Sequence, residues 1–277
     1  MDIIILLKAV ILGIVEGLTE FAPVSSTGHM IIVDDMLLQS EEFLGKYVAN
    51  TFKIVIQLGS ILAVIVIFKD RFIELLGFKK LRGESVSQGS KHLKLTHVIV
   101  GLIPAGVLGV LFEDYIDEHL FSLETVLIGL VIGAVLMIIA DIFGPKEPNM
   151  QSVDQMTYKQ AFSIGLIQCL SLWPGFSRSG STISGGVLLG MSHRAAADFT
   201  FIMAVPIMVG ASGLSLMKNW QYFSMEALPF FAAGFITSFI FALISIKFFL
   251  QLINKIKLMP FAIYRIALAL VIYLVYF

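Results

Sequence analysis

Two glutamates and a group of hydroxyl residues stand close together near the start of the chain. Residues 16–29 read EGLTEFAPVSSTGH, so Glu16 and Glu20 are four positions apart. On a helix this spacing places both carboxylates on one face, where they could share a divalent cation. The alternative is that each carboxyl is protonated or paired with a distant arginine. We predict a metal site at Glu16 and Glu20, because acids within an otherwise apolar membrane stretch generally serve function.

The hydroxyl residues follow a proline. Ser25, Ser26, Thr27 and Gly28 offer hydroxyls and backbone N–H groups near a helix start, which suits an anion. Such residues also pack between membrane helices, so the prediction depends on their neighbours. His29 could accept the Ser26 hydroxyl proton, or its ring could simply bond to a backbone carbonyl. We predict Ser26, His29 and the nearby Glu20 as catalytic residues, and Ser25 and Thr27 as substrate-binding residues.

An arginine stands among serines and glycines in the second half of the chain. Residues 173–182 read WPGFSRSGST. Arg178 stays charged and presents a fork of donors that matches phosphate oxygens. Because a lone arginine in apolar surroundings is costly, it needs an anionic partner, either the glutamate pair or a substrate. Arg178 is therefore predicted to be catalytic and to bind substrate. Four of its neighbours are predicted to bind substrate through close backbone approach or hydroxyl groups: Gly175, Ser177, Ser179 and Thr182. Gly180 and Ser181 offer groups of the same kind.

Together the two segments supply acids, a base, hydroxyls and a cation. This set is typical of metal-assisted phosphoryl transfer, in which positioning and charge neutralisation do most of the work. Gln57 lies within another apolar stretch and is predicted to bind substrate, the alternative being a bond between helices. Arg265 lies near the start of the last apolar stretch, where a structural carbonyl is the favoured partner and a lipid headgroup the alternative.

The composition indicates that lipid surrounds most of the chain. Of 277 residues, 57% are hydrophobic and 14% are charged, and the mean hydropathy is +0.91. Soluble domains are about 45–50% apolar and about 25% charged. The net charge of −1 and the scattered basic residues argue against nucleic-acid binding. A single cysteine, Cys169, excludes an intrachain disulfide and a cysteine-based metal site.

Apolar stretches of about 20 residues, long enough to cross the bilayer as helices, recur along the chain. We predict six full spans, at 52–68, 95–112, 125–143, 195–217, 228–250 and 259–277. Two further stretches, 6–36 and 161–190, are each broken midway by polar residues, glycine and proline. Irregular backbone at membrane depth is tolerated only where protein or a water-filled cavity satisfies it. We predict that both are re-entrant helix-loop-helix hairpins and that their breaks mark the site.

Charges in the loops predict the orientation. Basic loops lie on the cytoplasmic side. The loop 69–94 holds Lys69, Arg71, Lys79, Lys80, Arg82, Lys91 and Lys94, and the next loop holds Glu113, Asp114, Asp117 and Glu118. The first loop is therefore predicted inside and the second outside, which puts both termini outside.

The two broken stretches resemble one another. Gly13, Glu16, Pro23 and Ser26 correspond to Gly165, Gln168, Pro174 and Ser177, with one residue fewer before the second proline. Because the predicted hairpins enter from opposite faces, the halves would be inverted repeats, which place a shared site near the midplane. The alternative is two unrelated kinked helices. We predict a single integral membrane domain, 1–277, with repeats at about 1–143 and about 158–277.

The segments EGLTEFAPVSSTGH and PGFSRSGSTISGG resemble the two signature motifs of the bacterial undecaprenyl-diphosphate phosphatases, the bacitracin-resistance proteins. The resemblance extends over the chain through VIQLGSILAV, MTYKQAF and PFAIYR. Ala22 departs from the larger apolar residue that the family often has there. The resemblance implies an all-α polytopic bundle with inverted-topology repeats and two re-entrant hairpins. The resemblance places the family's motif residues at Glu16, Glu20, Ser25, Ser26, Thr27, His29, Gly175, Ser177, Arg178, Ser179 and Thr182.

The resemblance further implies hydrolysis of undecaprenyl diphosphate to the monophosphate and phosphate, which recycles the lipid carrier of peptidoglycan synthesis and confers bacitracin resistance. It implies a Mg²⁺ or Ca²⁺ cofactor, a homodimer, and a site open to the outer face of the bacterial cytoplasmic membrane. Ser26 would attack with His29 as base, the alternatives being His29 or an activated water as nucleophile. The rival function is a flippase for a polyprenyl phosphate, because inverted repeats with broken helices also build transporters.

Overall fold

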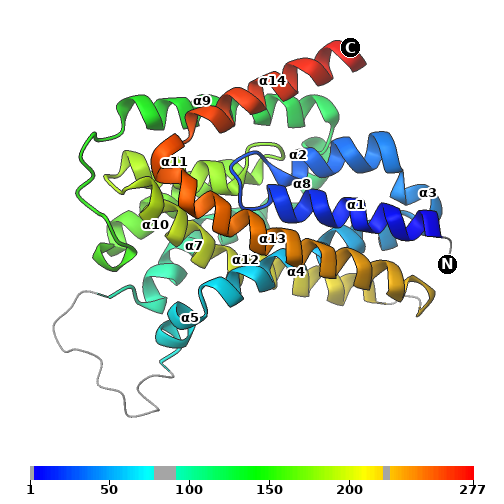
Figure 1. Cartoon of the computed structure of the whole chain (residues 1–277), viewed down its shortest axis with the longest axis horizontal. Helices are drawn as coiled ribbons and strands as arrows, with labels where there is room; N and C mark the ends of the chain where they lie inside the picture. The colour runs from blue at the N-terminus through cyan, green and yellow to red at the C-terminus, as the bar shows by residue number, and fades with distance from the viewer. Residues whose placement is uncertain (1–2, 78–91, 221–224) are drawn as a thin grey trace.

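The computed structural model describes residues 3–77, 92–220 and 225–277 (Figure 1). Within these ranges the regular secondary structure is helical, and one isolated parallel bridge joins Met150 to Met191. The prediction of an all-α fold is confirmed at this level. Four of the seven basic residues on which the predicted orientation depends, Lys79, Lys80, Arg82 and Lys91, lie outside the described residues.

Five helices in the described part of the chain are long and apolar enough to cross a membrane. They are α4 (Lys46–Ile67), α9 (Leu123–Phe143), α12 (His193–Asn219), α13 (Leu228–Ile256) and α14 (Met259–Tyr276). They confirm five of the six predicted spans. The sixth forms α7 (Leu95–Leu111), whose 17 residues are at the lower end of the about 17–25 that a crossing needs.

Polar caps and prolines set where these helices begin. Ser122 and Ser192 cap α9 and α12 by accepting hydrogen bonds from backbone N–H groups in the first turn. α13 and α14 each carry a proline near the first helical position, where no N–H is needed. Short helices connect the long ones: α3 (Ser40–Leu44), α5 (Lys69–Leu75), α8 (Glu113–His119), η2 (Val153–Gln155) and η5 (Met225–Ala227).

The two broken stretches form helix-turn-helix units. The first unit runs from α1 (Ile3–Thr19) through a turn into α2 (Ser26–Met30) and the π-helix η1 (Ile31–Leu38). Lys8 Nζ donates to Leu38 O at 2.6 Å, so the second arm returns beside the first.

The second unit runs through α10 (Tyr158–Gln168), η3 (Cys169–Leu172) and α11 (Arg178–Leu188). Gln160 Nε2 donates to Leu189 O at 3.4 Å, which brings the end of this unit back to its beginning. Both breaks therefore lie at the tips of folded-back units.

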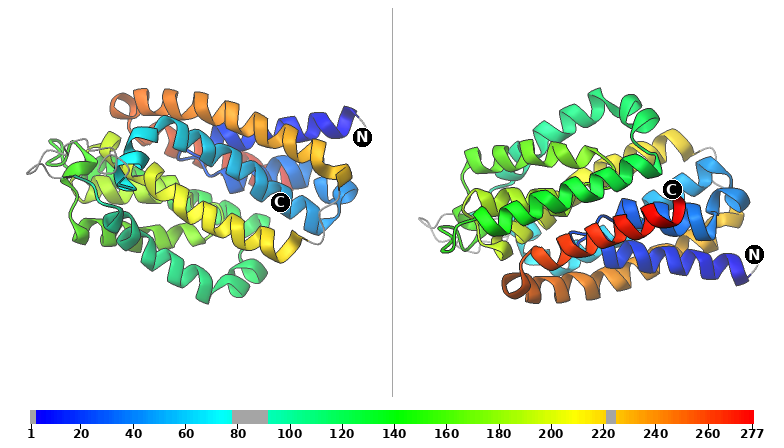
Figure 2. Two further views of the ribbon diagram at one scale, coloured as in Figure 1. Left: turned by 90° about the horizontal axis from the view of Figure 1, so that it is seen from below. Right: turned by 90° about the horizontal axis from the view of Figure 1, so that it is seen from above.

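Each unit packs its first arm on a helix from the other half of the chain. α1 lies along α13, and α10 lies along α7 (Figures 1 and 2). A Cβ added at Gly13 would lie 2.5 Å from Gly234 O, and one added at Gly165 would overlap Gly101 O. Small residues let helix backbones approach this closely in membranes. The same glycine-to-backbone contact is thus made twice, once in each half.

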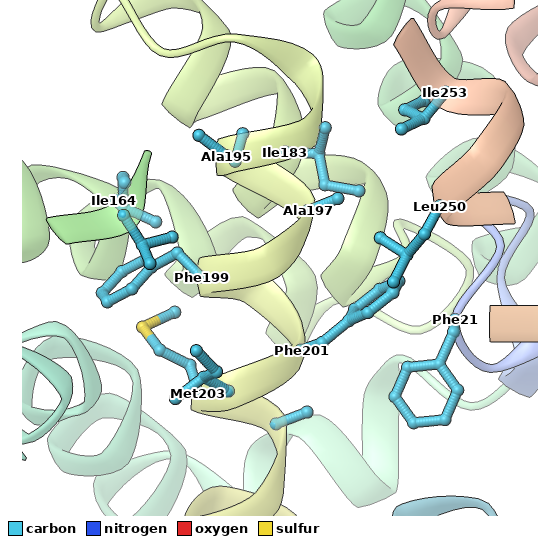
Figure 3. Close-up of a cluster of buried hydrophobic side chains, with 14 of the residues drawn as sticks. Phe21, Ile164, Ile183, Ala195, Ala197, Phe199, Phe201, Met203, Leu250 and Ile253 are labelled. Atoms are coloured by element: carbon cyan, nitrogen blue, oxygen red, sulfur yellow. The ribbon is translucent and has the colours of Figure 1, made fainter. Parts of the chain in front are cut away.

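The core surrounds α12 and supports the first tip. Figure 3 shows Phe21 and Leu250 close to Phe201 in a cluster of buried apolar side chains. Phe21 is fully buried, and its ring packs edge-on against Phe201 with the centroids 5.1 Å apart. Because Phe21 follows Glu20 directly, this packing fixes the backbone that carries the Glu20 carboxylate.

Candidate active site

The two tips share one unusual turn. Ser25 and Ser177 precede α2 and α11 with positive φ values of 73° and 75°. Each side-chain oxygen accepts from the N–H three residues on, that of Gly28 at 3.3 Å and that of Gly180 at 3.1 Å. Positive φ is strained for a residue with a Cβ, and an N-cap oxygen satisfies a helix N–H that would otherwise lack a partner.

This geometry corrects the predicted register of the repeat. The prediction aligned Ser26 with Ser177, whereas the caps pair Ser25 with Ser177. Adding 152 to Gly13, Glu16, Ser25 and Gly28 gives Gly165, Gln168, Ser177 and Gly180, so no gap is needed. The prediction was wrong because it used the prolines as anchors, and these stand at different places in the two turns. Ser26 therefore corresponds to Arg178.

These two corresponding residues hold one carboxylate between them. Arg178 Nη2 donates to Glu20 Oε1 at 2.8 Å, and Ser26 Oγ donates to Glu20 Oε2. Ser179 Oγ donates to Ala22 O at 3.2 Å, which ties the two tips together a second time. The prediction that Arg178 needs an anionic partner is confirmed, and that partner is Glu20.

A cavity of about 230 Å³ lies between the tips. Eight of the predicted site residues line it, from both tips and from α4: Glu20, Ser25, Ser26, Thr27, Gln57, Gly175, Ser177 and Arg178. The cavity also contacts residues that were not predicted as site residues, in α7, α12 and the second tip: Ala105, Gln168, Ser171, Leu172, Trp173, Pro174, Ile207, Met208 and Ala211. It is thus polar at the tips and apolar toward α12.

Gln168 is the most informative of the additional residues. It is 1% exposed, and neither Nε2 nor Oε1 has a hydrogen-bond partner. The repeat in the sequence could have indicated that Gln168 belongs to the site, because Gln168 corresponds to Glu16.

Four predicted site residues are not among those that line the cavity. Ser179 bridges the tips, as described above. Thr182 Oγ1 donates to Arg178 O at 2.8 Å and accepts from Thr200 Oγ1 at 2.8 Å. Arg178 Nη1 in turn donates to Thr200 O at 3.2 Å, so Thr182 and Thr200 together fix the orientation of the arginine. Glu16 is 4% exposed, and its Oε1 has no partner.

The fourth residue, His29, has both ring nitrogens bonded to groups other than Ser26. Nδ1 lies 2.8 Å from Ser25 O, and Nε2 lies 2.7 Å from Tyr264 Oη. A carbonyl only accepts, so Nδ1 carries a proton and donates to Ser25 O, and Nε2 is bonded to the Tyr264 hydroxyl. The hydrogen bond from Ser26 to His29 that the predicted proton transfer needs is therefore not formed in this arrangement, in which Ser26 donates to Glu20.

Arg265 holds the second tip in place. It is fully buried, and Nη2 donates to Gly129 O at 3.2 Å, Gly175 O at 2.8 Å and Phe176 O at 2.9 Å. These contacts confirm the prediction of structural carbonyl partners. The three carbonyls pair Nη2 without an acid, whereas the buried Nε has no partner. Arg178, not Arg265, lines the cavity.

Glu16 and Glu20 are the two carboxylates that could hold a divalent cation at this site. Among the described residues, no group of three or more His, Cys, Asp or Glu side chains is placed to hold a metal. Mg²⁺, however, is usually held by one or two carboxylates together with substrate phosphates. The buried, unpartnered oxygen of Glu16 and its neighbour Glu20 match that pattern.

Long apolar helices around a small cavity with an arginine, a carboxylate and hydroxyls define a multi-pass membrane protein whose internal site suits an anion. A sequence model of the family described as bacitracin resistance protein BacA matches residues 9–271. The chain belongs to this family.

Relatives named undecaprenyl-diphosphatase match along the whole chain. A protein of Geobacillus sp. (strain WCH70) is 77% identical over 277 residues, which is all of both chains. One of Bacillus subtilis (strain 168) is 62% identical over 270 residues, 98% of each chain. One of Staphylococcus haemolyticus (strain JCSC1435) is 59% identical over 281 aligned positions, covering 100% of this chain and 97% of the other.

Proposed function

We propose that this chain hydrolyses undecaprenyl diphosphate to undecaprenyl phosphate and inorganic phosphate. In a bacterium this reaction recycles the lipid carrier of peptidoglycan synthesis and confers bacitracin resistance. The observation that carries the proposal is Glu20, whose two oxygens bind Ser26 and Arg178 beside one cavity in an apolar bundle. A hydroxyl, a carboxylate and a guanidinium in that setting suit a pyrophosphate, and the names of the relatives support the substrate.

The contacts of Ser26 support it as the nucleophile. Its hydroxyl attacks the terminal phosphorus, and its proton moves to Glu20, to which it is already bonded. The anhydride P–O bond breaks and undecaprenyl phosphate leaves. Water then hydrolyses the phosphoserine, which releases inorganic phosphate and restores Ser26.

Arg178 binds the terminal phosphate. Its guanidinium is always charged and is oriented by Thr200 O, so it stabilises the charge on the transferred group without rearranging. The α11 backbone N–H groups that follow Ser177 add donors at a helix start. Ser25, Thr27, Gly175 and Gln57 complete the binding site.

The hydrogen bonds of His29 favour Glu20 over His29 as the base. His29 would contribute by holding Ser25, the cap of the first tip, through Nδ1. Two rival versions use His29 or an activated water as the nucleophile. Phosphate release that survives unchanged in both Ser26→Ala and His29→Ala variants would exclude a nucleophilic role for either side chain.

We propose that Glu16 and Glu20 hold Mg²⁺ or Ca²⁺ with the pyrophosphate. The bound ion would neutralise charge on the substrate oxygens. The support is the unpartnered Oε1 of Glu16, buried where an uncompensated carboxylate is costly.

The finer fold proposal is two inverted repeats, each with a re-entrant hairpin, and an active site open to the outer face. It is supported by the matching glycine contacts of α1 with α13 and of α10 with α7. It is also supported by both hairpins returning to the end at which they start. The exposed Thr27 lines the cavity, so labelling of Thr27→Cys in a Cys169→Ala background with a membrane-impermeant maleimide tests the face. Labelling only in inverted vesicles would contradict an outward opening.

The family resemblance also implies a homodimer in the cytoplasmic membrane. Crosslinking in native membranes tests this part of the proposal, and a monomer alone would contradict it.

The rival function is a polyprenyl-phosphate flippase, for which Arg178 would bind the anion. Purified protein in detergent separates the two, because no second compartment exists there. We expect phosphate release from undecaprenyl diphosphate that EDTA abolishes and Mg²⁺ or Ca²⁺ restores. The absence of release with every divalent metal would favour the flippase, and release unaffected by EDTA would contradict the metal site alone.

A further inference from the structure

We propose that Gln168 is a substrate-binding residue whose side-chain amide is satisfied by the pyrophosphate. This inference rests on the proposed function and adds a residue to it. Gln168 ends α10 and lines the cavity, yet it is 1% exposed, and both polar atoms of its side chain lack a partner. A buried amide without partners destabilises a fold, so its presence at a cavity calls for a ligand.

The neighbouring polar groups do not meet this need. Ser171 Oγ donates to the main-chain carbonyl of Gln168 at 2.6 Å, so it is turned from the amide. Arg178 is bonded to Glu20 and to Thr200 O, and Ser177 Oγ accepts from Gly180 N. The cavity itself is therefore the source from which Gln168 can gain partners.

The amide suits one kind of ligand. Nε2 carries two donors for phosphate oxygens, and Oε1 accepts from a protonated phosphate oxygen or from water. The corresponding residue of the first tip, Glu16, is an acid. At the equivalent positions, the acidic Glu16 would face the proposed cation, and the neutral Gln168 would face the anion without repelling it.

The Gln168→Leu variant separates substrate binding from a structural role. Leucine removes the unsatisfied amide, so we expect Tm in detergent to rise by about 2–4 °C. The loss of a hydrogen bond to a charged group should raise KM about 10–100-fold. kcat should stay nearly constant, because the bond is made to substrate and transition state alike.

Gln160→Leu is the matched control, eight residues earlier on the same helix. Both polar atoms of the Gln160 amide have partners: Oε1 accepts from Thr157, and Nε2 donates to Leu189 O. This variant should lower Tm and leave KM unchanged. If Gln168→Leu behaves like Gln160→Leu, the amide of Gln168 is structural and the inference is overturned.

Gln168→Glu tests the sign of the ligand. A carboxylate at this position should repel the pyrophosphate and raise KM beyond that of Gln168→Leu. A KM that falls, or equals that of the wild type, would contradict an anion at this position.

A binding measurement keeps this inference distinct from the proposed reaction. Inorganic pyrophosphate should raise the Tm of the wild type, and much less that of Gln168→Leu. An equal rise in both proteins would overturn the role of Gln168 even if the wild type released phosphate. A wild type that binds pyrophosphate through Gln168 but releases no phosphate would overturn the reaction and leave the binding site standing.

Discussion

The guanidinium of Arg178 lies 2.8 Å from the carboxylate of Glu20, although the two residues are 158 positions apart. Both side chains are largely buried, with 14% and 6% of their surfaces exposed. The charge of each side chain compensates the charge of the other, which makes the burial of both tolerable. The contact therefore joins the two tips energetically as well as geometrically.

Glu20→Gln and Arg178→Gln should each destabilise the protein by about 3–5 kcal/mol, because each leaves a buried charge without its partner. The double variant should recover part of this loss, since both charges are gone. Thermal unfolding in detergent measures the effect, and phosphate release should be lost in all three variants. Strictly additive losses of stability would contradict the coupling of the two residues.

Gly133→Ala should displace the anchor of the second tip. The added Cβ would overlap Arg265 Nη2 and Phe176 O. We expect a loss of about 1–3 kcal/mol in stability and a clear fall in phosphate release. Gly106→Ala, on α7, is the control, because its Cβ would meet no heavy atom within 4 Å. A Gly133→Ala protein as active and stable as Gly106→Ala would contradict the role given to Arg265.

Ser177→Gly and Ser177→Ala both remove the capping oxygen and differ only in the Cβ. Because Ser177 has φ of 75°, alanine retains the backbone strain that glycine relieves. We expect Ser177→Ala to be less stable than Ser177→Gly by about 1–3 kcal/mol in thermal unfolding. Equal stabilities would show that the turn has no such strain.

Asp154 should give the protein a pH-dependent stability. Burial alone would raise its pKa, but Arg71 at 2.7 and 2.9 Å and Leu93 N–H at 3.0 Å hold the pKa of this carboxyl below its ordinary value. A carboxyl whose pKa is lower in the folded protein than in the unfolded chain stabilises the fold at pH values above its unfolded pKa of about 3.9. This stabilisation is lost as the pH falls through the pKa of the folded protein.

Asp154→Asn should therefore lower Tm by about 2–4 °C at pH 7, and the difference from the wild type should shrink toward pH 3. Asp70→Asn, at an exposed carboxylate on α5, is the control and should change Tm little. A difference that grows on acidification would contradict the sign.

Apolar runs predicted the helices because lipid demands about 20 apolar residues, but polar residues concealed helix ends. α4 begins at Lys46, six positions before the prediction, since Lys46, Asn50 and Thr51 resemble a loop. α13 continues to Ile256, six positions past the predicted end at 250, because the polar residues Gln251, Asn254 and Lys255 still belong to the helix. The hydropathy of a segment indicates whether lipid or water surrounds it. The length of a helix depends instead on how far its backbone hydrogen bonds continue.

The candidate site was predictable in its members more than in its contacts. The cost of an unpaired charge predicted an anion for Arg178, and Glu20 supplies it. The partner of His29 was not predictable, because Tyr264 is 235 positions away and nothing local indicates it. Gln168 was identified only as the counterpart of Glu16 and not as a site residue, because its lack of hydrogen-bond partners is visible only in the structure.

The separation of Glu20 from Arg178 also bears on how the chain is made. At about 5–20 residues per second, a ribosome needs roughly 8–30 s to extend the nascent chain by the 158 positions between them. During that interval the first helix-turn-helix unit has its acids but not the arginine that neutralises one of them. The ion pair that joins the two tips can therefore form only after the segment that carries Arg178 has been translated.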